Sequence, residues 1–156
     1  MIPRILLLIL LLSVSVAAQT PAAPSPNDEV KKAFTAVNGW VVKSAEMVPA
    51  DKYNYKPIDT VRTFGQQIAH IADTYNYFCA HAVGNKVEYS EAVEKGGTDK
   101  ETLLPKLKEA VGRCTAAYDA KDFQFRPLFD NLGHTNLHYG NIITYLRMMG
   151  LKPPSS

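Results

Sequence analysis

Apolar residues recur at intervals of three and four in four separate stretches of this 156-residue chain. Such spacing places the apolar side chains on one face of an α-helix. The expected helices cover residues 26–47, 63–84, 102–120 and 130–149, with irregular loops at 48–62 and 84–98. No stretch has the alternating pattern of a convincing strand. The sequence therefore predicts an all-α fold, a four-helix bundle, in which facing helices build any ligand or metal site.

The ends of the expected helices carry recognisable signals. Ser25 is an N-cap followed by proline at the first helical position, and Thr63 opens a capping box. Pro105 is tolerated only in a first turn, because a later proline removes a backbone hydrogen bond, so we start the third helix at Thr102. Gly150 fits a left-handed cap after the fourth helix.

Residues 1–18 have the pattern of a secretory signal peptide. Arg4 provides a positive charge, residues 5–12 form an unbroken apolar run, and small residues precede the expected cleavage site. The apolar run is shorter than the roughly 18 to 20 residues that span a bilayer, which favours cleavage over an uncleaved membrane anchor. Residues 19–26 are an expected proline-rich linker, and residues 27–154 the domain. We expect an exported protein, periplasmic or extracellular, without a stable membrane anchor after cleavage.

The two cysteines, Cys79 and Cys114, make an even count in a chain with an export signal. An oxidising compartment favours pairing between them. Closing a loop of roughly 35 residues stabilises a fold by about 3 to 4 kcal/mol in the chain-entropy model. We therefore predict a disulfide between the second and third helices, with two free buried thiols as the alternative.

Three histidines form the candidate metal site. His134 and His138 are four residues apart on the fourth helix, which offsets them by about 40° and about 6 Å and lets both bind one ion. His70 in the second helix supplies a third imidazole. Three histidines leave coordination positions open for water or substrate. His81 lies about 16 Å further along the helix than His70, so we expect a surface or hydrogen-bonded imidazole there rather than a ligand.

Asp73, Tyr77 and Tyr145 are the candidate catalytic residues beside these histidines. Asp73 and Tyr77 lie three and seven residues after His70, and Tyr145 lies near the direction of the histidine pair. Asp73 is placed to accept the second ring proton of His70 and orient it. The alternative is a solvated carboxylate or a pair with Arg62. The two tyrosines are equally compatible with pocket donors and with packing residues.

The chain also resembles the DinB/YfiT-like superfamily over about residues 28–154. The likeness rests on residues 63–73 (TFGQQIAHIAD) and 134–154 (HTNLHYGNIITYLRMMGLKPP), which carry the histidines and a Gly-x-x-Pro-Pro stop. It implies a four-helix bundle with a divalent transition metal, zinc, nickel, manganese or iron, held by the three histidines. It also implies that homodimers are common. Leu137 stands where many relatives carry an acidic residue, but it is about 100° off the ligand direction, so the metal prediction is retained.

The predicted function is hydrolysis of an unidentified small-molecule substrate. The metal would lower the pKa of a bound water and polarise a carbonyl, with Asp73, Tyr77 or Tyr145 relaying the proton. The resemblance also implies thiol-dependent transferases, but their reduced cosubstrate is a cytosolic resource, whereas this chain has an export signal. A bundle that only binds a metal or a small ligand is the other alternative.

Charge and missing motifs argue against several further classes. A net charge of +2 with interspersed signs gives no basic stripe for nucleic acid. The chain has no Gly-x-Ser-x-Gly, so covalent catalysis through serine is not supported. It also lacks the Cys-x-x-Cys-His and Glu-x-x-His patterns of haem and di-iron sites.

Overall fold

Four long helices make up the domain. The computed structural model describes residues 25–156, so the predicted signal peptide and most of the predicted linker lie outside the described residues. The long helices are α1 Pro26–Met47, α2 Phe64–Ala82, α4 Lys100–Asp119 and α5 Phe125–Met148, and the connections contain the 3-10 turn η1 Ala50–Lys52 and the one-turn helix α3 Ala92–Lys95. Residues 25–156 contain no strand, which confirms the predicted all-α bundle. None of these helices combines the length and apolar character needed to cross a membrane.

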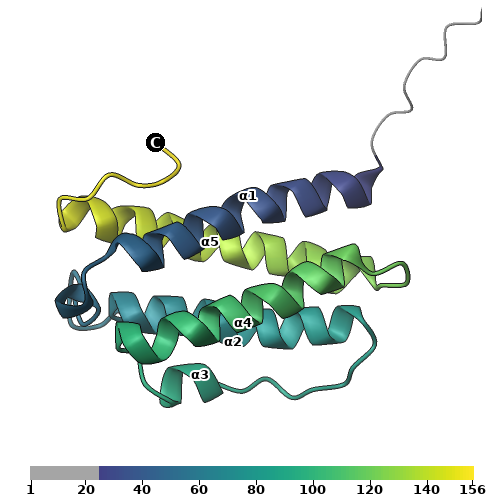
Figure 1. The fold of residues 1–156 in the computed structure, drawn as a ribbon, viewed down its shortest axis with the longest axis horizontal. Helices are drawn as coiled ribbons and strands as arrows, with labels where there is room; N and C mark the ends of the chain where they lie inside the picture. Colours follow the sequence, from purple (N-terminus) through teal and green to yellow (C-terminus); the bar gives the residue numbers. More distant parts are fainter. Residues whose placement is uncertain (1–24) are drawn as a thin grey trace, which may run out of the picture.

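The helices are arranged in two layers. Figure 1 shows α1 beside α5 in one layer, with α2 and α4 in the other. α2 packs against both α4 and α5, and α1 packs against α5 and α4. The connection between α2 and α4, residues 83–99, returns along the length of the bundle, so these two helices run in the same direction. α2 therefore has two covered faces, one toward α4 and one toward α5.

The predicted caps are confirmed at three helix ends. Ser25 Oγ accepts a hydrogen bond from the Asp28 amide at 3.2 Å, and the Asp28 carboxylate reaches back to the Ser25 amide. Thr63 and Gln66 form the same reciprocal pair at the start of α2. Each box satisfies two amides that a helix start leaves without a backbone partner. Gly150 follows α5 with a φ of 76°, the left-handed conformation expected of it.

The predicted start of the third helix was wrong by two residues. Asp99 is the N-cap of α4, because its carboxylate accepts a hydrogen bond from the Thr102 amide at 2.9 Å. Pro105 therefore lies inside α4, beyond the first turn, where it removes one backbone hydrogen bond. Leu103 and Leu107 on either side of it are completely buried, and that apolar burial offsets the loss.

The predicted start of the fourth helix at residue 130 was also wrong, because α5 already begins at Phe125. Pro127 falls in its first turn, where an amide has no intrahelical partner to lose. Arg126 supports this turn by pairing with Asp130 at 2.7 Å. The apolar pattern did not reveal the extension, since Phe125 and Phe129 are both exposed and extend no buried stripe.

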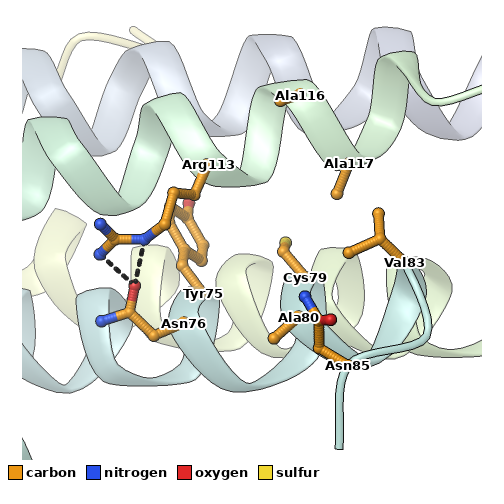
Figure 2. A pocket seen from close by; sticks show the side chains of 9 residues that line it. All are labelled: Tyr75, Asn76, Cys79, Ala80, Val83, Asn85, Arg113, Ala116 and Ala117. Atoms are coloured by element: carbon orange, nitrogen blue, oxygen red, sulfur yellow. Dashed lines mark hydrogen bonds between the residues drawn. The ribbon is translucent and has the colours of Figure 1, made fainter.

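A disulfide joins α2 to α4. Cys79 and Cys114 are bonded, with their Cα atoms 5.1 Å apart, which confirms the preferred prediction over free thiols. Figure 2 shows Cys79 pointing toward α4, beside a hollow of about 290 Å³ between the two helices. At one end of this hollow Arg113 donates two hydrogen bonds to Asn76 Oδ1. The α4 side of α2 is therefore held by a covalent bond and by paired polar groups.

Candidate metal centre

The three predicted ligands converge on the other covered face of α2. His70 comes from α2, and His134 and His138 come from neighbouring turns of α5. One ligand atom from each ring lies within 4.8 Å of the others, and the ring centroids are 4.4 to 5.1 Å apart. Because α2 packs against α5, residues distant in sequence meet here. Among the described residues, these three form the one group of histidine, cysteine or acidic side chains close enough together to hold a metal ion.

The surroundings keep the imidazoles neutral. Burial lowers the pKa of His70 to about 4, and the positive charge of Arg62 acts in the same direction. Burial likewise lowers the pKa of His138 to about 4, with His134, His70 and Arg62 adding to the effect. The pKa of His134 is also lowered, first by burial and then by Arg62. Neutral imidazole is the form that binds metals, so all three rings are ready to act as ligands at neutral pH.

Gln67 fixes the protonation of His138. Its side-chain oxygen lies 2.9 Å from Nδ1 of His138, and an amide oxygen can only accept a hydrogen bond. Nδ1 therefore carries the ring proton, and the lone pair of Nε2 faces the other histidines.

A tyrosine that sequence reasoning did not name contacts His70. The hydroxyl of Tyr89 lies 3.1 Å from Nδ1 of His70, which leaves Nε2 of that ring available. Tyr89 belongs to the connection between α2 and α3 and is 43% exposed. Two of the three candidate ligands therefore have a hydrogen-bonding partner on the ring nitrogen that faces away from the cluster.

His134 supports the fit of a cation at this point. Its Nε2 lies 3.1 Å from Nε2 of His138, so two nitrogen lone pairs face one another unless a proton or a cation lies between them. The other ring nitrogen of His134, Nδ1, is buried and has no hydrogen-bond partner. Buried polar atoms are rarely left unpaired, and such exceptions often mark functional positions. The donor set therefore fits a divalent transition metal.

Asp73 has a different set of partners from those expected. Its two carboxylate oxygens accept hydrogen bonds from the backbone amides of Val93 and Glu94, at 2.8 and 3.0 Å. Asp73 is 3% exposed, and both of its carboxylate oxygens are used in hydrogen bonds to the start of α3. Arg62, the alternative partner, instead forms an ion pair with Glu94 at 3.2 Å. The expected contact between Asp73 and His70 is replaced by these bonds, because they satisfy amides that α3 leaves free.

The two candidate tyrosines lie on different sides of the centre. Tyr145 is buried, and its hydroxyl donates to the backbone carbonyl of Arg62 at 2.8 Å. Tyr77 packs its ring edge-on against Tyr89 at 5.9 Å, on the side of the connection. His81 follows the expectation of a hydrogen-bonded imidazole, since its Nε2 lies 2.9 Å from the carbonyl oxygen of Val87 and it is outside the cluster.

Sequence reasoning missed Gln67 and Tyr89, and it considered Arg62 only as an alternative partner of Asp73. Gln67 had a usable signal, because it lies one helical turn before His70 and so shares its face. Tyr89 and Arg62 lie outside regular helix, where spacing does not show which residues meet in space. Their places depend on the path of the connections.

Comparison with known proteins places the chain by sequence. No curated protein and no solved structure matched it significantly. A family model described as the DinB superfamily matches residues 33–145, which is most of the chain and includes the three histidines. The helical bundle and the histidine cluster agree with that match, and we conclude that this chain belongs to the DinB superfamily.

Proposed function

We propose that this chain binds one divalent transition metal through His70, His134 and His138 and acts as a metal-dependent hydrolase on a small-molecule substrate. The observation that carries the proposal is the convergence of three ligand atoms within 4.8 Å from two helices. Three imidazoles suit zinc, nickel and iron in particular. When bound, such a metal supplies Lewis acidity that polarises a carbonyl and makes water more acidic.

The residues around the histidines prepare the site. Burial keeps the rings neutral, as their lowered pKa values indicate. Gln67 and Tyr89 hold the outward-facing ring nitrogens of His138 and His70. Among the candidate proton-relay residues, Tyr77 packs against Tyr89, and its hydroxyl has no hydrogen bond to the described residues. Asp73 and Tyr145 are engaged with backbone groups.

The disulfide supports an exported hydrolase rather than a thiol transferase. A structural disulfide between Cys79 and Cys114 is typical of oxidising compartments. A transferase would need a reduced low-molecular-weight thiol, which such a compartment does not maintain. Hydrolysis needs only water, so it is compatible with a periplasmic or extracellular location.

Elemental analysis of the purified protein tests the metal. We expect one equivalent of a transition metal in the natural protein and none in His70→Ala. His81→Gln is the matched control, because it replaces the one histidine outside the cluster and retains a donor for Val87. Unchanged metal content in His70→Ala would overturn the proposed site.

A second measurement tests the enzyme. Turnover of generic ester and amide substrates is assayed with and without a chelator, in the natural protein and in His138→Ala. We expect hydrolysis that the chelator abolishes and that metal restores only when His138 is present. One bound equivalent without turnover of any ester or amide would instead favour the binding bundle.

A further inference from the structure

Four residues of α2 form a single stripe along the connection that follows the helix. His70, Asp73, Tyr77 and His81 are spaced by three, four and four residues, which places them on one face. His70, Tyr77 and His81 contact residues 84–91, and Asp73 accepts hydrogen bonds from two amides of α3. We call residues 84–91 the strap. Figure 1 shows this connection running along the length of α2.

The strap is tethered to α2 on both sides of Tyr89. On one side, His81 Nε2 donates to the carbonyl oxygen of Val87 at 2.9 Å. On the other side, the buried Asp73 carboxylate accepts hydrogen bonds from the backbone amides of Val93 and Glu94 in α3. Two fixed points a few residues apart restrict the backbone between them and hence the reach of the Tyr89 side chain.

Between these tethers, Tyr89 meets both His70 and Tyr77. Its hydroxyl lies 3.1 Å from Nδ1 of His70, and its ring packs edge-on against Tyr77. The ring is 43% exposed, so apolar burial contributes little to its position. The tethers and the Tyr77 contact are therefore what bring its hydroxyl to the histidine.

We propose that Tyr89 is a positioning residue that fixes the ring of His70 for metal binding, and that the strap holds Tyr89 in contact with that ring. This inference rests on the proposed metal site. In the tautomer that leaves Nε2 free for a metal, Nδ1 of His70 carries a proton and donates a hydrogen bond to the Tyr89 oxygen. Asp73 and His81 act on the centre through the strap and not by touching the metal or its ligands.

Tyr89→Phe tests the role of the hydroxyl, because it keeps the ring and removes only the oxygen. Affinity for Zn²⁺ and Co²⁺ is measured by competition with a chromophoric chelator. Loss of such an outer partner lowers metal affinity by about 10- to 100-fold, and we expect a decrease in that range. The Co²⁺ absorption spectrum should also change, which a general loss of stability would not produce.

Tyr139→Phe is the matched control. It also removes one side-chain hydrogen bond of a tyrosine, to Ser155 at 2.9 Å, but its ring packs against Trp40 on the side of α1. We expect its metal affinity to stay within about twofold of the natural protein, because the lost hydrogen bond involves no candidate ligand. Equal affinities for Tyr89→Phe and Tyr139→Phe would overturn the proposal.

A double-mutant cycle tests delivery by the strap. Asp73→Asn keeps one acceptor oxygen at the start of α3 and removes the other. If Asp73 acts through Tyr89, Asp73→Asn lowers metal affinity in the natural background and adds little to Tyr89→Phe. Fully additive effects of the two substitutions would contradict the positioning role of the strap.

One readout separates this inference from the metal proposal itself. In the metal-free protein, the ¹⁵N shifts of the His70 ring report its tautomer and its hydrogen bond. We expect Tyr89→Phe to change them and Tyr139→Phe to leave them unchanged. A natural protein that binds no metal would refute the proposed function, whereas unchanged His70 shifts in Tyr89→Phe would refute the Tyr89 contact.

Discussion

The two covered faces of α2 differ in how their polar groups are satisfied. On the side of α4, Cys79 is bonded to Cys114, and Arg113 is paired with Asn76. On the side of α5, two imidazole Nε2 atoms face each other at 3.1 Å, and Nδ1 of His134 is buried without a partner. α2 thus packs on one side across a disulfide and a bonded Arg–Asn pair, where the Tyr75 hydroxyl is also buried without a partner, and on the other side it contributes to a cluster of three imidazoles. The disulfide side stabilises the bundle, and the histidine side is the one to which we assign the proposed metal.

Removing the disulfide should affect stability and spare the metal centre. We expect the double variant Cys79→Ala with Cys114→Ala to lose about 3 to 4 kcal/mol of unfolding free energy, because its unfolded chain is no longer restrained by the closed loop. Urea denaturation measures this loss, and elemental analysis below the unfolding transition should still find one metal equivalent. A variant that is folded but metal-free would show that the two faces are not independent.

Replacing Gln67 should instead weaken metal binding more than it weakens the fold. Gln67→Leu removes the acceptor that holds the Nδ1 proton of His138, so metal affinity should fall by about 10- to 100-fold, or about 1.4 to 2.7 kcal/mol. Competition with a chelator measures the change. Gln67→Glu retains an acceptor oxygen at the same place and should recover most of the affinity. Equal losses in the two variants would assign the effect to packing.

The histidine face should also make the metal-free protein sensitive to acid. The pKa values of His70 and His138 are lowered to about 4 in the folded state, from 6.5 when unfolded. Between pH 6.5 and about 4 the unfolded chain therefore binds more protons, and stability decreases as the pH falls through this window. Thermal unfolding of the metal-free protein across this range measures the slope. The stability of His138→Gln should depend less steeply on pH. A pH dependence equal to that of the natural protein would contradict the lowered pKa of His138.

The smallest effect is expected at Leu137. This residue directly precedes His138 but is 66% exposed, so it points away from the centre. We expect Leu137→Glu to change metal affinity by less than about twofold and unfolding free energy by less than about 0.5 kcal/mol. Parallel metal titration and denaturation check both values. A large gain in affinity would mean that a carboxylate here reaches the metal.

Local spacing was enough to predict much of the fold. Helix caps at Ser25 and Thr63 depend on side chains three residues away, so the sequence shows them directly. The histidine pair on α5 is equally local. The early start of α4 was missed because Pro105 was expected only in a first turn. The early start of α5 was missed because its first aromatic residues are exposed and extend no apolar stripe.

The chain by itself therefore determined the long helices, the faces they present and the residue types available for a metal. Only the tertiary structure decided which faces meet, because that depends on the return path of residues 83–99 along the bundle. That path brings Tyr89 to His70 and assigns Asp73 to the backbone of α3. Helical periodicity encodes the direction of a side chain within its own helix, whereas these contacts arise between segments whose relative placement is fixed by packing.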